Sequence, residues 1–164
     1  EVGGFPFTIR AVDRGTPPQF DDAEFEITVD VAPLRIEGDT TFDLIVTTVV
    51  VLPLMTIVDG IPLPYEQQLV ARGGLRPYAW SENELPRAVS FLIPESGIPE
   101  GLELTADGRI RGAVTDTSQV VRLSVPFTDI DLTGFFFAAE VVDSQEEPES
   151  ESALFLIPTV PIGG

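Results

Sequence analysis

The chain has 164 residues, and its 27 Asp and Glu residues against 9 basic residues give a formal net charge of −18. This charge argues against nucleic acids and anionic membranes as partners, since both are bound through basic patches. The sequence contains no Cys and no His, and all of its basic residues are Arg. It therefore lacks the usual residues of thiol, imidazole and amine catalysis and of zinc sites, and we do not expect an enzyme.

Two alternating runs open the chain and flank a loop rich in Gly, Pro and acidic residues. Alternation of apolar and polar side chains with a period of two is typical of strands with one face in water. Residues 5–11 and 24–31 therefore predict an antiparallel hairpin with one apolar face. The apolar positions are Phe5, Phe7, Ile9 and Ala11 in the first run and Phe25, Ile27, Val29 and Val31 in the second.

The middle of the chain predicts further short strands separated by turns. The apolar stretch of residues 44–55, LIVTTVVVLPLM, is too short for a membrane-spanning helix and predicts a buried strand. Short strands are also expected within residues 64–74, 76–82, 97–114 and 118–129, with a tight turn at Asp107-Gly108. Because no helical periodicity extends beyond a turn or two, we expect an all-β sandwich.

The first hairpin matches the end of the chain without gaps, at the constant offset that brings Phe7 onto Phe137. Apolar positions, loop length and an Asp that opens the loop are all preserved, so we interpret the match as an internal repeat. Residues 1–34 are then the last hairpin of an upstream repeat, or a sheet-completing segment, and residues 35–164 are a complete repeat. We expect the chain to be a piece of a longer protein. The matched pairs are Phe7 and Phe137, Val12 and Val142, Asp13 and Asp143, Pro18 and Pro148, Ala23 and Ala153, Phe25 and Phe155, and Ile27 and Ile157.

Several motifs follow one another in a fixed order. They are Pro64-Tyr65, Gly73-Gly74, Pro77-Tyr78-Ala79-Trp80, Ile98-Pro99-Glu100-Gly101-Leu102 and Gly108-Arg109-Ile110-Arg111-Gly112. This run resembles the bacterial Ig-like repeats called He-PIG, and residues 11–18, AVDRGTPP, resemble the closing hairpin of the related cadherin-like domains of the dystroglycan type. The resemblance implies an Ig-like or cadherin-like β-sandwich with Greek-key-type antiparallel sheets, in an extracellular or cell-surface protein.

The resemblance also implies calcium as a candidate cofactor, because in cadherins an Asp-x-Asp pair and the Ala-x-Asp aspartate share calcium. The candidate ligands are Asp13, Asp129, Asp131 and Asp143. Two features depart from the family: the Asp-x-Asp pair precedes the penultimate strand, and residues 32–39 lack the Asp-x-Asn-Asp-Asn cluster. The alternative is that Asp129 and Asp131 form a turn and that the acidic loops are solvated tips that oppose edge-to-edge aggregation.

The outer face of the closing hairpin differs between the two copies. The same offset places Leu154 and Leu156 where the first hairpin has Glu24 and Glu26. An apolar outer face marks an interface or a face covered by another element. We predict that Leu154 and Leu156 are buried, either under the strand within residues 44–52 or against a neighbouring subunit.

The expected function is that of a structural or adhesive repeat module, which acts through contacts with neighbouring repeats and through self-association. One alternative is a calcium- or carbohydrate-binding module attached to a secreted enzyme. Trp80 with Tyr65 and Tyr78 could stack on a sugar, although a lone Trp in a sandwich is more often part of the core. The other alternative is a filament subunit in which residues 1–34 add strands to a neighbour. Neither nucleic-acid binding nor membrane insertion is expected.

Overall fold

The computed structural model describes residues 3–44, 47–58, 61–93, 96–114, 116–125 and 129–162, with only the backbone of residues 161 and 162. The chain divides into two compact units, residues 1–32 and residues 33–164.

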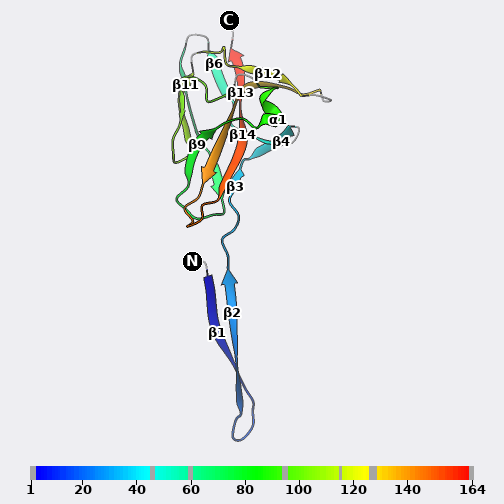
Figure 1. The fold of residues 1–164 in the computed structure, drawn as a ribbon, viewed down its shortest axis with the longest axis vertical. Helices are drawn as coiled ribbons and strands as arrows, with labels where there is room; N and C mark the ends of the chain where they lie inside the picture. Colours follow the sequence, from blue (N-terminus) through cyan, green and yellow to red (C-terminus); the bar gives the residue numbers. More distant parts are fainter. Residues whose placement is uncertain are drawn as a thin grey trace. The chain divides into compact units, whose positions relative to one another are not determined.

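The first unit contains the N-terminal hairpin, in which β1 (Gly3–Val12) pairs with β2 (Phe20–Val29) in antiparallel order (Figure 1). Phe7 lies opposite Phe25 and Phe5 lies opposite Ile27, as the alternation predicts. The rings of Phe7 and Phe25 stack with their centroids 5.6 Å apart. Directly opposed side chains in an antiparallel pair share one face, so the apolar pairs form a continuous face on this two-stranded sheet.

The second unit consists of short strands and one single-turn helix, α1 (Arg87–Ser90). The almost complete absence of helix among the described residues agrees with the all-β prediction. The strands are β3 (Arg35–Glu37), β4 (Thr40–Leu44), β5 (Thr47–Val51), β6 (Met55–Val58), β7 (Leu63–Gln68), β8 (Val70–Arg72), β9 (Ala79–Asn83), β10 (Leu102–Leu104), β11 (Arg109–Val114), β12 (Val121–Ser124), β13 (Asp131–Val142) and β14 (Ser150–Ile162).

The C-terminal hairpin, β13 and β14, forms the middle of the larger sheet (Figure 1). On one side β13 pairs with β12 and β9, both antiparallel. On the other side β14 pairs with β5 and β6, and these two pairings are parallel. Strand β4 extends the sheet beyond β5. A smaller antiparallel sheet, in the order β10-β11-β7, supplies the second layer, and β3 pairs with β8.

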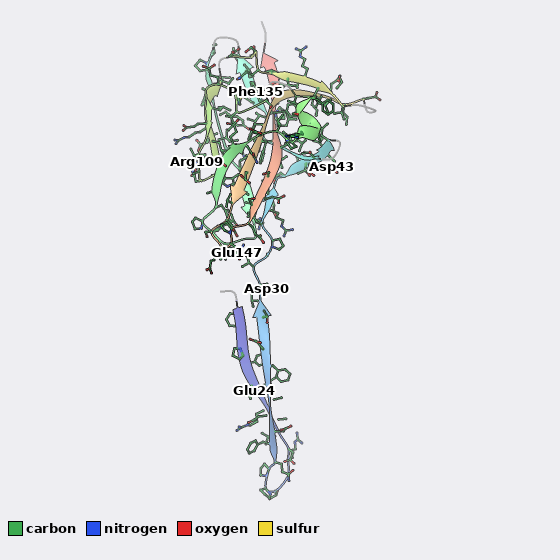
Figure 2. All side chains as sticks on the ribbon, in the orientation of Figure 1. Glu24, Asp30, Asp43, Arg109, Phe135 and Glu147 are labelled. Atoms are coloured by element: carbon green, nitrogen blue, oxygen red, sulfur yellow. The ribbon has the colours of Figure 1, made fainter. Side chains whose placement is uncertain are left out.

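The main core lies between these two layers. Phe135, Phe137 and Phe155 of the C-terminal hairpin belong to the same buried cluster as Tyr65 and Ile110 of the smaller sheet. Figure 2 shows Phe135 among the side chains inside the second unit. The fold is therefore a β-sandwich whose sheets are mostly antiparallel, as predicted, with two parallel pairings that the sequence did not indicate.

Trp80 and Tyr65 are part of this core rather than of an exposed platform. Their side chains are 5% and 8% exposed, and the Tyr65 hydroxyl donates a hydrogen bond to the Pro53 carbonyl oxygen at 3.0 Å. Burial raises the pKa of Tyr65 to about 12. The prediction that Trp80 packs in the core is confirmed. No helix among the described residues has the length and hydropathy to cross a membrane.

The opposite face of the larger sheet is also covered. Leu154 and Leu156 are 0% and 2% exposed, which confirms the predicted burial. They form a second buried cluster with Val49 of β5 and with Val89 of α1. Val49 lies beside Leu154 in the same sheet, so β5 widens the sheet edge to edge and does not lie over it. The expectation that the strand within residues 44–52 forms the cover is therefore corrected, because α1 and the residues after it supply that layer; residues 45 and 46 lie outside the described part.

Candidate interaction surface

The N-terminal and C-terminal hairpins have the same strand register. Phe137 lies opposite Phe155 and Phe135 lies opposite Ile157, which are the counterparts of the pairs in β1 and β2. The rings of Phe137 and Phe155 stack with centroids 5.2 Å apart, close to the 5.6 Å of Phe7 and Phe25. The sequence match therefore corresponds to the same strand register and to similar ring stacking in both hairpins.

The loops of the two hairpins are held by the same hydrogen bonds. Asp13 Oδ1 accepts the backbone N–H groups of Gly15 and Gln19 at 2.9 and 2.8 Å. Asp143 Oδ1 accepts those of the equivalent residues, Gln145 and Glu149, at 3.3 and 2.9 Å. In both loops the Asp N–H also donates to the carbonyl oxygen of the second of these residues. The two aspartates thus close equivalent loops, as side chains that accept local backbone N–H groups commonly do.

Asp143 makes two hydrogen bonds that its counterpart lacks, both at Oδ2, and one of them comes from the Gln145 side-chain amide. The other comes from the backbone N–H of Leu75 at 2.9 Å, and the neighbouring Ser144 N–H donates to the Leu75 carbonyl oxygen at 3.0 Å. Gly74 makes this approach possible, because a Cβ built on it would lie 2.6 Å from Asp143 Oδ2. Within the described part of the N-terminal hairpin, no group donates to Asp13 Oδ2, and Asp13 is exposed.

The electrostatics of the two carboxyl groups follow from these contacts. Burial raises the pKa of Asp143, but the hydrogen bonds from Leu75, Glu149 and Gln145 outweigh burial and hold the pKa below its ordinary value of 3.8. The N–H groups of Gln19 and Gly15 lower the pKa of Asp13 in the same way. Both side chains are therefore carboxylates that serve as hydrogen-bond acceptors at neutral pH.

Within its own unit, no other described element covers the apolar face of the N-terminal hairpin. Phe7 and Phe25 are 40% and 48% exposed, whereas Phe137 and Phe155 are 0% and 1% exposed. Side chains stand out from both faces of the β1–β2 ribbon in Figure 2. A continuous apolar sheet face of this kind is an interaction surface by its chemistry. We call it the open face; its large side chains are Phe5, Phe7, Ile9, Phe25, Ile27 and Val29.

The reverse face of the same hairpin is mostly polar, apart from the exposed pair Val12 and Phe20 next to the loop. Glu24 and Glu26 project from β2 on this side, opposite Thr8 and Pro6. Arg10 forms a paired contact with Asp22 through two N–H donors, at 2.6 and 2.7 Å. The hairpin is therefore amphipathic, with one face suited to a second protein layer and the other suited to water.

The candidate calcium ligands of the second unit, Asp129, Asp131 and Asp143, do not converge. In the described part of the chain no group of three or more Asp, Glu, His or Cys side chains could hold a metal ion. The two carboxylate oxygens of Asp143 accept four hydrogen bonds. Asp131 accepts a hydrogen bond from the Ser124 hydroxyl at 2.6 Å, and Asp129 is exposed at a bend. Asp13, in the first unit, accepts the Gly15 and Gln19 N–H groups with Oδ1. The donor set as it stands does not fit calcium, which needs several converging oxygens.

The structural role of Asp143 was missed by the sequence interpretation. A carboxylate in an acidic loop fits a metal site, a solvated tip or a hydrogen-bond acceptor equally well, and its decisive partner, Leu75, is 68 residues away. The available signal was the Gly73-Gly74 motif, which marks a close approach of another group to the backbone. The acidic loop is partly structural for a second reason, since a Glu149 oxygen accepts the Leu34 N–H at 3.0 Å.

Comparison with solved structures finds cadherin extracellular domains. The protocadherin γB4 extracellular domain aligns with 96% of this chain at 14% identity and a TM-score of 0.50, and the aligned part is 22% of that chain. The protocadherin γB7 EC3-6 cis-dimer structure aligns with 95% at 15% identity and a TM-score of 0.48, over 32% of that chain. Mouse clustered protocadherin γC3 EC1-3 aligns with 96% at 16% identity and a TM-score of 0.44, over 43% of that chain.

The similarity to protocadherin γB4 shows that the chain has a cadherin-like fold. No protein-family model and no curated protein matches the chain. The resemblance to He-PIG and dystroglycan-type domains therefore stays a prediction. At this level of identity the comparison concerns the fold alone, and the chain spans less than half the length of each of these three chains.

Proposed function

We propose that this chain is a structural or adhesive repeat module of a bacterial extracellular or cell-surface protein, acting through contacts between repeats. The observation that carries the proposal is the pair of sequence-matched hairpins with equal register and equal Asp-centred loops. Binding would be spread over sheet faces and edges, because repeat proteins interact through extended surfaces. The cadherin-like fold supports this function by analogy only.

The proposed domain organisation follows from the same observation. Residues 1–34 are the last hairpin of an upstream repeat, and residues 35–164 are a complete repeat. A hairpin of two strands is marginally stable alone in water, so its open face implies that it belongs to a larger β-structure. The second unit already buries an equivalent hairpin of its own, Phe137 and Phe155 included.

The cellular location and the adhesive role can be tested separately. An antibody raised against the 164-residue chain should label intact cells of the source organism as strongly as permeabilised cells. Labelling that requires permeabilisation would overturn the extracellular location. Beads coated densely with the chain should aggregate if contacts between copies are adhesive. Beads that stay dispersed at every coating density would contradict an adhesive role and favour a structural role as a spacer between domains.

The alternatives have less support from the side chains. A sugar-binding platform would need exposed aromatic faces, but Trp80 and Tyr65 are buried. A calcium-dependent module would need a converging set of oxygens, which the described candidates do not form. A filament subunit built by strand addition would use the edges of β1 and β2. This alternative predicts assembly that depends on protein concentration and disappears when residues 1–34 are deleted.

A further inference from the structure

We propose that the open face of the N-terminal hairpin is covered by one layer of β-strands, supplied by polypeptide that precedes Glu1 and built like the layer over the C-terminal hairpin. The inference rests on the proposed repeat function and adds what that function leaves open. It specifies which face is covered, which face stays in water, and which backbone group of the covering layer meets Asp13.

The second unit provides the template for the covered state. Its hairpin has the same stacked Phe pair in the same register, and there the pair lies in one core cluster with Tyr65 of β7, Ala71 of β8 and Ile110 of β11. Because the open face carries equivalent side chains at Phe5, Phe7, Phe25 and Ile27, it fits a layer of the same kind. The chemistry of that layer is aliphatic and aromatic, without charge on the contacting face.

Asp13 gives the proposal a specific polar contact. In the second unit the Leu75 N–H meets Asp143 Oδ2, and the Leu75 carbonyl oxygen accepts the Ser144 N–H. The corresponding groups of the N-terminal hairpin are Asp13 Oδ2 and the Arg14 N–H, and neither has a hydrogen-bond partner among the described residues. The covering layer should therefore present one backbone N–H and one carbonyl oxygen to this loop, next to a residue without a side chain, as at Gly74.

The reverse face of the N-terminal hairpin should stay uncovered. The C-terminal hairpin is buried on both faces, because Leu154 and Leu156 pack in a cluster that includes Val89 of α1. The N-terminal hairpin has Glu24 and Glu26 at these positions, and burying two unpaired carboxylates under an apolar helix would be costly. The upstream repeat should thus lack a counterpart of α1 over its closing hairpin.

A second copy of the chain fits the open face less well. In each copy, the covering layer already packs on the C-terminal hairpin of the same copy, so it has no free face for a second hairpin. Exchange of the N-terminal hairpin into that place would bring Glu24 against Val89 and its neighbours. Two open faces packed on each other would bury the Phe pairs, but they would leave Asp13 Oδ2 and the Arg14 N–H without the strand backbone that their counterparts contact.

The test is oxidative footprinting of individual Phe side chains in two forms of the protein. One is the 164-residue chain, and the other is extended at its N-terminus by the stretch of its own gene equal in length to residues 33–130. In the 164-residue chain Phe7 and Phe25 should react at least roughly tenfold faster than Phe137 and Phe155. In the extended chain all four should react at the slow rate, at any protein concentration. The C-terminal pair is the internal control.

Two results would overturn the proposal. Equal labelling of Phe7 and Phe25 in both forms would mean that the preceding polypeptide does not cover the face. Protection that increases with concentration in the unextended chain, with no further protection in the extended form, would assign the face to a second copy. Neither result depends on cell-surface labelling, so the proposed location can fail independently.

A matched pair of variants tests the Asp13 contact and remains informative if footprinting is difficult. Asp143→Asn should lower the melting temperature of the second unit in both forms. Asp13→Asn should leave the melting of the unextended chain unchanged and lower a separate transition of the extended chain. An Asp13→Asn variant that melts like the parent in the extended form would contradict a backbone N–H at Asp13 Oδ2.

Discussion

Single residues show most directly what a second layer does for this hairpin. Phe7 and Phe137 occupy the same register position and stack on the same kind of partner, yet they are 40% and 0% exposed. Local sequence and strand pairing are nearly equal at the two sites, so the difference in burial comes from the layer above. The energetic contribution of each ring should therefore differ in the same sense.

Truncation of the two rings measures this difference. Phe137→Ala should lower the free energy of unfolding of the second unit by about 3–5 kcal/mol, because it removes a fully buried ring and leaves a cavity. Phe7→Ala should change that free energy by less than about 0.5 kcal/mol. Urea unfolding followed by the fluorescence of Trp80, the single Trp, reports on the second unit alone. Equal losses in the two variants would contradict the assignment.

Because of Asp143, we expect the second unit to lose stability at low pH. Its folded pKa is lowered below 3.8, so the carboxylate stabilises the fold above that pH, and this contribution is lost as the pH falls through the folded pKa. Asp143→Asn should make the unfolding free energy depend less on pH below 3.8. Part of the pH dependence should remain in this variant, because the pKa values of Asp107 and Asp116 are also lowered. Denaturant titrations at several pH values in this range, with Asp13→Asn as the control, would measure the effect. If Asp143→Asn left the pH dependence of the unfolding free energy unchanged, the stabilising role of the Asp143 carboxylate would be excluded.

Among the secondary-structure elements, α1 distinguishes the two hairpins. It is a single turn, but with the residues that follow it provides Val89 and Ile93, both almost fully buried against the outer face of the larger sheet. The switch from Glu24 to Leu154 at the equivalent position matches the presence of this cover. A hairpin of one design can therefore be covered on one face or on two, depending on the residues that point outward.

The equivalent outer positions give a second matched pair. Leu154→Ala should cost about 2–5 kcal/mol of unfolding free energy, because Leu154 is 0% exposed. Glu24→Ala should cost less than about 0.5 kcal/mol, since it removes an exposed side chain. Thermal or urea unfolding of both variants, followed by Trp80 fluorescence, is sufficient. A Leu154→Ala variant as stable as the parent would show that the outer cluster is not a packed core.

The sequence predicted some elements well, for physical reasons that are visible in the structure. The period-two runs set the hairpin register, and the Asp107-Gly108 turn joins β10 to β11 with a Gly108 N–H to Thr105 carbonyl hydrogen bond of 2.8 Å. The motif residue Gly112 is also explained. Its φ is +139°, and a Cβ there would collide with the Gly101 carbonyl oxygen.

Other elements depended on contacts that no local pattern encodes. The parallel pairing of β5 and β6 with β14 joins segments far apart in the chain. An apolar run such as residues 44–55 fits a strand within the sheet and a strand that covers it equally well. The turn of α1 is too short to show a helical period. The role of Asp143 required the position of Leu75, which only the tertiary fold supplies.

For the whole molecule, the net charge of −18 shapes the response to ions. Most described Arg partners are exposed acids, such as Glu66 for Arg109 at 3.2 Å and Glu103 for Arg111 at 2.8 Å. Exposed pairs of this kind contribute little to stability, and the excess negative charge repels itself. Any added salt should therefore stabilise the chain slightly by screening.

A calcium experiment must separate screening from binding. We expect the melting temperature in millimolar calcium to equal that in magnesium at the same concentration, and to differ from that in chelator only by the screening effect. The reason is that the described carboxylates do not converge on a common point. An upward shift specific to calcium would mean that the native state binds the ion, since only preferential binding to the folded form raises stability in this way.

The central claim is that the two hairpins are equivalent elements, one covered and one open. Amide hydrogen exchange of the 164-residue chain at low concentration tests it most directly. The amides of Phe137 and Phe155 should be among the slowest to exchange, while those of Phe7 and Phe25 should exchange through local opening, orders of magnitude faster. Protection of Phe7 and Phe25 equal to that of Phe137 and Phe155 would show that the N-terminal hairpin needs no second layer, and would contradict the claim.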